Sequence, residues 1–214
     1  MKRRPQIKIC GMTEPDNVRL IVELNPDLLG FIFVPGSPRF IGEESRALEV
    51  VHEVPRSIAK AGVFRDALVA DLVHTAVLLN LEVIQLHGAE DEQYVTALKT
   101  ELPASVKVWK AVSLRDDLKG AISKVPHSAD LVLLDGPRPG SGQRFDWSLL
   151  LEDTPIEKPF MVAGGIGPEN ISEARRLFDA QPHCIGVDLN SQVESASGMK
   201  DVERVRSCIE AMRV

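Results

Sequence analysis

Two side chains in this sequence are suited to proton transfer, and each ends a strand-like segment. Cys10 closes the segment that begins at Ile7, and Asp135 follows the apolar run Leu131 to Leu134. A thiol can act as a general base, and a carboxyl as a general acid, when the surroundings shift the pKa of each group. A cysteine in such a place is also a common small hydrophobic residue, and an aspartate a common turn residue. Neither residue alone therefore establishes a site.

Glycine-rich loops lie beside these residues and suit a phosphate group. The segment GPRPGSG follows Asp135 directly, and further glycines cluster at 164–167. Glycine lets backbone N–H groups approach a phosphate, and loops after the last strands of a β/α barrel commonly bind one. Since no histidine and carboxylate cluster has metal-site spacing, the residues predict proton transfer on a phosphorylated small molecule. The other polar groups expected at strand ends are Arg39, His87, Asp188, Asn190 and Ser191.

Strand-like apolar runs alternate with helix-like amphipathic runs along the whole chain. A continuous apolar run such as Leu131 to Leu134 is typical of a parallel strand covered on both faces, and eight strand-like segments, about 25 residues apart, predict a parallel β/α (TIM) barrel. An open doubly wound sheet is the alternative, but CGMTEP stands where its G-x-G-x-x-G is usually found. The expected strands are 7–10, 28–33, 57–64, 83–87, 106–112, 131–135, 160–163 and 184–189. The expected helices are 14–24, 43–54, 67–79, 91–100, 114–124, 168–178 and 199–212.

Short sequence patterns predict a helix cap, a helical turn and one long loop. Thr13 is expected to cap the first helix, because a threonine side chain before Pro15 can accept from the first turn. Phe145-Asp146-Trp147 resembles the start of a helical turn, and residues 190–198 are expected to form a loop.

Composition limits the class of protein. The chain has 214 residues, of which 44% are hydrophobic and 26% charged, so it can bury a core as one domain over 1–214. A net charge of -6 argues against a general nucleic-acid binder. No apolar run approaches a membrane span, and the amino-terminal residues lack the hydrophobic segment of a signal peptide. Three widely spaced cysteines predict a reducing, cytoplasmic setting.

Eight segments, in order, carry a family resemblance along nearly the whole chain. They are KICGMT (8–13), GFIFVPGSPRFI (30–41), AGVF (61–64), QLHG (85–88), LLDG (133–136), GSGQRFDWSLL (140–150), AGGIGPENI (163–171) and GVDLNSQVESASGMKD (186–201). With these segments the sequence closely resembles phosphoribosylanthranilate isomerase, a barrel enzyme of tryptophan biosynthesis. The resemblance implies an Amadori rearrangement of N-(5-phosphoribosyl)anthranilate to 1-(2-carboxyphenylamino)-1-deoxyribulose 5-phosphate, without a cofactor.

The resemblance also implies roles for individual residues. Asp135 would be the general acid that protonates the furanose ring oxygen, and Cys10 the general base that takes the proton from C2. Arg39 would hold the anthranilate carboxylate, and Asp188 would contact the anthranilate amine or the sugar. Backbone groups around Gly142, Gly165 and Ser191 would hold the phosphate.

These roles require opposite pKa shifts. The thiol of Cys10 must lose its proton, for which Lys8, two residues away on the same strand face, offers positive charge. Asp135 must keep its proton, which requires a raised pKa. Two departures from the family pattern concern binding: Pro139 replaces a glycine and removes one phosphate donor, and Gln192 stands where some relatives have glycine.

Two other functions compete with the isomerase. Indole-glycerol-phosphate synthase, the enzyme of the next pathway step, would be expected to carry catalytic lysines and glutamates at strand ends, and Lys110 weakly supports it. A phosphate-binding barrel without activity would be favoured if Cys10 or Asp135 were replaced, and both are present. The partner is expected to be a phosphorylated small molecule, and the oligomeric state either a monomer or a homodimer.

Overall fold

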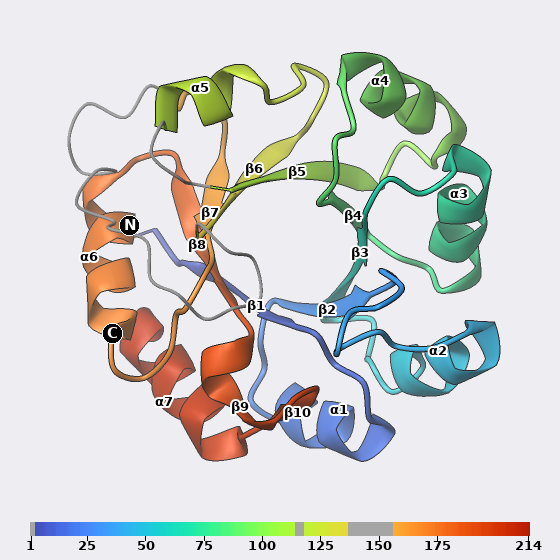
Figure 1. The fold of residues 1–214 in the computed structure, drawn as a ribbon. Helices are drawn as coiled ribbons and strands as arrows, with labels where there is room; N and C mark the ends of the chain where they lie inside the picture. Colours follow the sequence, from blue (N-terminus) through green and yellow to red (C-terminus); the bar gives the residue numbers. More distant parts are fainter. Residues whose placement is uncertain (1–2, 114–117, 137–155) are drawn as a thin grey trace.

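The chain folds around a closed barrel of eight parallel strands. The computed structural model describes residues 3–113, 118–136 and 156–214. Neighbouring strands pair in the order β1 to β8, and β8 closes the ring by pairing with β1. Viewed down the barrel axis, the strands surround the centre and the helices lie outside them (Figure 1). The predicted β/α barrel is therefore confirmed, and the open doubly wound sheet is excluded.

The elements agree with the expected ones to within about one helical turn. The strands of the barrel are β1 (Gln6–Cys10), β2 (Leu28–Ile32), β3 (Ala59–Phe64), β4 (Val83–Leu86), β5 (Lys107–Ser113), β6 (Leu131–Asp135), β7 (Phe160–Val162) and β8 (Cys184–Leu189). The helices are α1 (Pro15–Val22), α2 (Glu44–Val51), α3 (Val69–Leu78), α4 (Glu92–Glu101), α5 (Leu118–Ser123), α6 (Ile171–Ala180) and α7 (Val202–Arg213). Every residue of β2, β4 and β6 is buried, as continuous apolar runs predict.

Side chains from most strands fill the interior of the barrel. One buried cluster includes Leu28, Ala61, Val83, Trp109, Leu131 and Met161, each from a different strand. A small second cluster of Cys10, Ile32 and Val63 belongs to the carboxyl-terminal halves of β1, β2 and β3. Layers of this kind make the barrel a packed core rather than a pore, and they confine an open cavity to its carboxyl-terminal mouth.

The segment after β8 differs from the expected loop. It contains a 3-10 turn, η2 (Ser191–Val193), and a two-stranded sheet of β9 (Glu194–Ala196) and β10 (Met199–Lys200). The Asn17 side chain accepts from the backbone N–H of Lys200 and donates to its carbonyl, which holds β10 against α1. The last helix therefore begins at Val202, where the Asp201 carboxylate caps it, and not at Met199.

The predicted cap of α1 is also wrong. Glu14 occupies the N-cap position without a capping side-chain hydrogen bond, and the Thr13 hydroxyl donates to the carbonyl of Gly198 and does not cap the helix. Thr13 thus helps to attach the segment after β8 to the barrel. The predicted helical turn at Phe145-Asp146-Trp147 and the first part of the helix expected at 114–124 lie outside the described residues. Within the described ranges, none of the helices has the length and apolar character needed to span a bilayer.

Candidate active site

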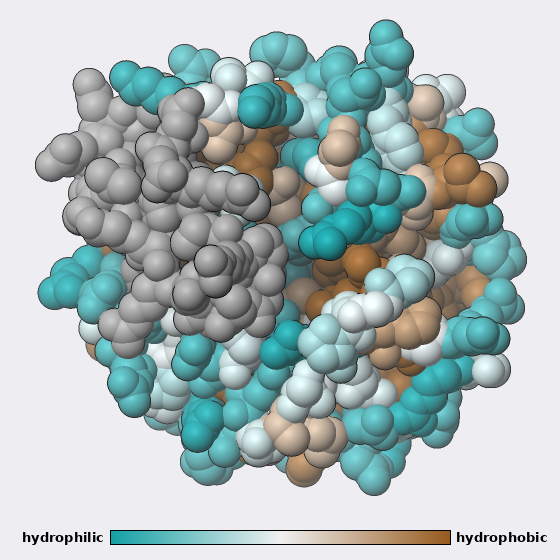
Figure 2. All heavy atoms as spheres, in the orientation of Figure 1, coloured by the Kyte–Doolittle hydropathy of each residue, from teal (hydrophilic) through white to brown (hydrophobic). Residues whose placement is uncertain are grey.

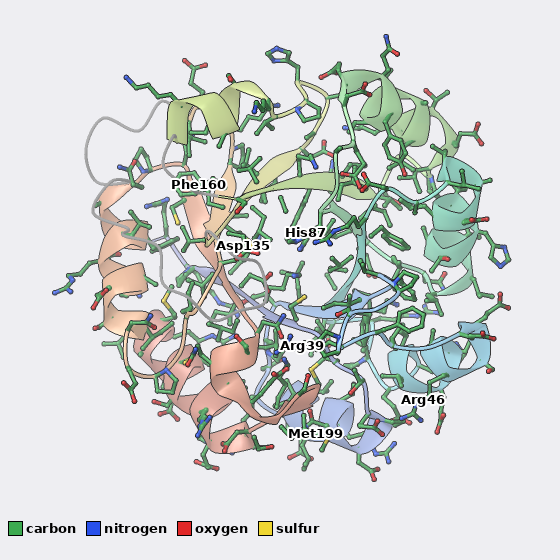
Figure 3. All side chains as sticks on the ribbon, in the orientation of Figure 1. Arg39, Arg46, His87, Asp135, Phe160 and Met199 are labelled. Carbon is green, nitrogen blue, oxygen red and sulfur yellow. The ribbon has the colours of Figure 1, made fainter. Side chains whose placement is uncertain are left out.

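A cavity of about 380 Å³ opens among residues at and beyond the carboxyl ends of the strands. Hydrophilic and hydrophobic residues meet near the centre of this face (Figure 2). Arg39, His87 and Asp135 lie towards the middle of the ring, whereas Arg46 and Met199 lie at its margin (Figure 3). The predicted site residues that line the cavity are Cys10, Arg39, His87, Asp135, Gly165, Asp188, Asn190 and Ser191. The predicted phosphate contact Gly142 lies outside the described residues.

Cys10 ends β1 and is 3% exposed. Gly30 of β2 makes room for it, since a Cβ at that glycine would stand 2.8 Å from the thiol Sγ. Burial raises the pKa of the Cys10 thiol, and the positive charge of Lys8 offsets this only in part. The expected lowering of this pKa is therefore wrong, because desolvation of the thiolate outweighs the effect of one nearby ammonium.

Asp135 ends β6 and shows the expected upward shift. Burial, and next the negative charge of Asp188, raise the pKa of the Asp135 carboxyl to about 6. The backbone N–H of Gly136 donates to its Oδ1 over 2.8 Å and opposes the shift. Gly164, with φ of 85°, leaves room for this turn: a Cβ there would lie 2.4 Å from the Gly136 nitrogen and 2.9 Å from Oδ1. Asp135 is thus a carboxyl able to hold a proton near neutral pH.

A buried ion pair connects the surroundings of these two groups. Lys8 Nζ donates to Asp188 Oδ2 over 2.8 Å, and the lysine side chain is fully buried. Burial opposes the charge of Lys8, but Asp188 and Cys10 outweigh it, so that the pKa of Lys8 is raised. Asp188 Oδ1 is buried and accepts no hydrogen bond from the described residues. The pair thus places a cation beside the thiol and an unpartnered acceptor at the cavity.

The raised pKa of Asp135 predicts a pH-dependent cost in stability. The native carboxyl keeps its proton up to about pH 6, whereas an unfolded aspartate ionises near 3.9, so stability falls as pH rises through this window and stays lower above it. We expect Asp135→Asn to increase the free energy of unfolding at pH 8 by roughly 1–3 kcal/mol and to leave it unchanged below about pH 4, measured by urea denaturation.

Asp130→Asn is the matched control for that measurement. The Asp130 carboxylate accepts from the backbone N–H of Val108 and from Lys99, so its removal should destabilise the fold at pH 8. Stabilisation by Asp135→Asn that is equal at both pH values would contradict the shift.

Arg39 is buried and held by a carboxylate far away in the sequence. Its Nε and Nη2 donate to Oε1 and Oε2 of Glu194, each over 2.8 Å. The hydrogen bonds that Arg39 donates to Glu194 raise the pKa of its guanidinium above the ordinary value. A bidentate pair of this kind fixes the plane of the guanidinium. Arg39 is therefore a preorganised cation on the cavity wall, although an isolated arginine in a loop is usually a surface residue.

His87 is uncharged and Lys110 is already paired, so neither has the surroundings of a charged catalytic residue. Burial, and then the charges of Lys8 and Lys110, lower the pKa of His87 to about 3, so its imidazole is neutral at pH 7. Its Nε2 lies 2.6 Å from Nε2 of Gln85. Lys110 pairs with Glu90 over 2.8 Å and donates to the Gly88 carbonyl, and it does not line the cavity.

The turn after β7 is fixed by Asn170. Its side chain accepts from the N–H of Gly167 and donates to the carbonyl of Gly165. Gly164 and Gly165 both have positive φ, a backbone conformation that residues other than glycine rarely adopt. Ser191 lies on the neighbouring segment after β8, so the structure brings Gly165 and Ser191 to one part of the cavity wall.

Sequence reasoning missed several residues at the cavity. Arg65 and Gln85 line it: Arg65 directly follows the predicted strand 57–64, and Gln85 lies in the second half of β4, so both are close to strand ends. Glu194 gave no such signal, because it lies within the predicted loop 190–198 and its role depends on a partner 155 residues away. Over the described parts of the chain, no group of three or more His, Cys, Asp or Glu side chains is arranged to hold a metal ion.

Comparison with known proteins identifies relatives along almost the whole chain. An N-(5'-phosphoribosyl)anthranilate isomerase of Paracoccus denitrificans is 40% identical over 212 residues, which cover 95% of this chain and 94% of the relative. The tryptophan biosynthesis protein TrpCF of Salmonella typhi is 38% identical over 206 residues, and there the match covers 96% of this chain and 43% of the relative. The chain thus spans less than half of the longer TrpCF relative.

Solved structures give the same result. Phosphoribosyl anthranilate isomerase from Thermus thermophilus superposes with a TM-score of 0.81 at 33% identity, covering 96% of this chain and 97% of that one. A phosphoribosyl anthranilate isomerase in complex with reduced 1-(o-carboxyphenylamino)-1-deoxyribulose 5-phosphate has a TM-score of 0.82 at 28% identity, covering 97% and 98%. The family described as N-(5'phosphoribosyl)anthranilate (PRA) isomerase matches residues 7–211. With this fold, this cavity and a family match over nearly its whole length, the chain belongs to the PRA isomerase family.

Proposed function

We propose that this chain catalyses the Amadori rearrangement of N-(5-phosphoribosyl)anthranilate in tryptophan biosynthesis, by general acid and base catalysis. One observation carries the proposal: a thiol and a carboxyl with a pKa near 6 line the same cavity, and one buried ion pair acts on both. Family membership supplies the substrate class. We also propose that residues 1–214 form one catalytic domain and that it works in the cytoplasm.

Asp135 opens the sugar ring in this mechanism. Its carboxyl donates a proton to the furanose ring oxygen, the bond between C1 and that oxygen breaks, and the nitrogen lone pair forms a C1=N double bond. Burial supports this step, because it keeps the carboxyl protonated at a pH where an exposed aspartate is ionised.

Cys10 then removes the proton from C2. The thiolate takes this proton, the C2–H electrons form a C1=C2 double bond, and the C1=N electrons return to nitrogen. The enolamine so formed tautomerises to the ketose as C1 gains a proton and the C2 hydroxyl loses one, so substrate and product are isomers. Lys8 supports the thiolate, because its ammonium is the strongest influence that lowers the pKa of Cys10.

Binding uses the remaining cavity residues. Arg39 donates to the anthranilate carboxylate, and backbone groups at Gly165 and Ser191, with Gly142 from the preceding loop, hold the phosphate. Asp188 Oδ1, which is buried and unpartnered among the described residues, suits a donor such as the anthranilate N–H. The relative that contains the reduced product analogue supports a phosphorylated ligand of this class.

The test of the proposed function is turnover of the fluorescent substrate, made in situ, by the purified protein. Loss of fluorescence at a rate proportional to enzyme concentration is the expected result. Binding without turnover would favour the inactive phosphate-binding barrel instead. The indole-glycerol-phosphate synthase alternative loses its support, since Lys110 is committed to Glu90 and Gly88 outside the cavity.

The pKa shifts predict a pH profile with a defined origin for each limb. The active form has Asp135 protonated and Cys10 ionised, although the pKa of the acid is below that of the base. We therefore expect kcat/KM to rise about tenfold per pH unit up to about pH 6, to level off above it, and to fall only at alkaline pH.

The Asp135→Asn variant shows whether the break in the pH profile near pH 6 comes from the Asp135 carboxyl or from the substrate phosphate. A phosphate group also titrates near pH 6, and its effect would persist in the variant. The residual kcat/KM of Asp135→Asn should instead keep rising through pH 6, because the break belongs to the carboxyl. A break at the same pH in both proteins would assign it to the phosphate.

A further inference from the structure

The guanidinium of Arg39 has two hydrogen-bonding edges, and only one of them pairs with Glu194. Its Nε and Nη2, which form one edge of the planar fork, donate to the two carboxylate oxygens of Glu194. Nη1 and the second N–H of Nη2 form the other edge. Arg39 lines the cavity, whereas Glu194 does not. Glu194 thus occupies one edge, and the other edge donates to none of the residues that the structure describes, so it is suited to a ligand.

Glu194 is itself held firmly on the segment after β8. Its Oε1 accepts from Lys200 Nζ over 2.6 Å and from the N–H of Gly198 over 3.1 Å. Its backbone carbonyl accepts from Arg204 over 2.8 Å. Lys200 donates in addition to Asn190 Oδ1, over 2.8 Å. The side chains of Glu194 and Lys200 are both buried, so this carboxylate has a fixed position from which to orient Arg39.

The cluster of Arg39, Glu194 and Lys200 has a net positive charge. Arg39 and Lys200 are cations and Glu194 is an anion, so the cluster has a net charge of about +1, which suits one ligand carboxylate. Glu194 therefore lowers the positive charge beside the ligand while it fixes the guanidinium. Charge and orientation predict opposite effects of removing it, and this makes the two separable.

We propose that Glu194, supported by Lys200, is a positioning residue that presents the free edge of Arg39 to the substrate carboxylate and so provides selectivity for carboxylate-bearing substrates. The inference rests on the proposed function, in which Arg39 binds the anthranilate carboxylate. Glu194 touches no reacting atom, and it acts through Arg39 alone.

The test compares Glu194→Gln with the wild type on two substrates, N-(5-phosphoribosyl)anthranilate and the aniline analogue that lacks the carboxylate. We expect kcat/KM for the anthranilate substrate to fall about 10- to 100-fold, mainly through KM, because a displaced guanidinium loses its alignment. The analogue should be turned over as by the wild type. Arg39→Met should show the same pattern, and adding Glu194→Gln to it should cause no further loss.

Two further variants keep the test decisive. Glu194→Asp retains the charge but shortens the side chain, so an intermediate loss with the same substrate pattern is expected, even if Glu194→Gln folds poorly. Glu90→Gln is the matched control, since Glu90 is also a buried glutamate paired with a lysine, Lys110, and does not line the cavity. It should leave the ratio of the two substrates unchanged.

The opposing outcomes are distinct. Tighter use of the anthranilate substrate by Glu194→Gln would mean that charge alone matters, and an equal loss on both substrates would mean that Glu194 serves only the fold. Either result overturns the inference. A wild type that fails to turn over the anthranilate substrate contradicts the proposed function instead. Calorimetric binding of the reduced product analogue and its carboxylate-free counterpart still tests Glu194 in that case.

Discussion

Asp135→Asn is expected to lower kcat/KM for N-(5-phosphoribosyl)anthranilate by about 10²- to 10⁴-fold, the usual share of a general acid. The amide has nearly the same shape as the carboxyl but has no acidic proton to give to the ring oxygen. The side chain is 8% exposed, so little water can replace it as proton donor. Steady-state fluorescence kinetics at pH 7 measure the loss.

Asp130→Asn provides the control for this prediction. It is the same substitution directly before β6, whereas Asp135 ends that strand, and Asp130 does not line the cavity. Its kcat/KM should stay close to that of the wild type once folded protein is counted. A loss of less than tenfold in Asp135→Asn would move the acid role to another group.

Cys10→Ser is expected to cause a loss of similar size, about 10²- to 10⁴-fold in kcat/KM. The hydroxyl of serine ionises far less readily than a thiol, so no base remains to take the C2 proton. Binding of the product analogue should change little, because the variant keeps the size and polarity of the side chain. Kinetics and calorimetry together distinguish lost chemistry from lost binding.

Cys184→Ser is the control for the cysteine. Cys184 is a buried free thiol at the start of β8, away from the cavity wall, and burial raises its pKa to about 11. Its replacement should affect stability and leave kcat/KM unchanged. Full activity of Cys10→Ser would show that another group takes the proton.

The barrel could be predicted from the sequence because its strands are marked twice. Each is a largely apolar run, of which Leu131 to Leu134 is the clearest, and most are followed within a few residues by polar or glycine residues where the chain reaches the mouth. The same rule placed Cys10, Arg39, Asp135 and Asp188 on one cavity. Placement at a strand end therefore sufficed to assemble the site.

The sequence did not reveal how these groups affect each other. Lys8 was expected to lower the pKa of Cys10, but its charge is paired with Asp188, and burial of the thiol has the larger effect. Glu194 was missed because a bidentate pair across 155 residues leaves no local pattern. The spacing of the strands along the sequence predicts which side chains lie at the same cavity. Burial and pairing with residues far away in the sequence determine whether those side chains are charged.

The pairing of Lys8 with Asp188 has a consequence for how the chain must assemble. These residues lie opposite each other in the register between β1 and β8, where the barrel closes. During synthesis from the amino terminus, Lys8 is made 180 residues before its partner. A nascent chain that packs β1 into a core too early would bury an unpaired ammonium, which costs about 3–5 kcal/mol. The pair that serves the site thus also disfavours burial of β1 before the last strand, β8, has been made.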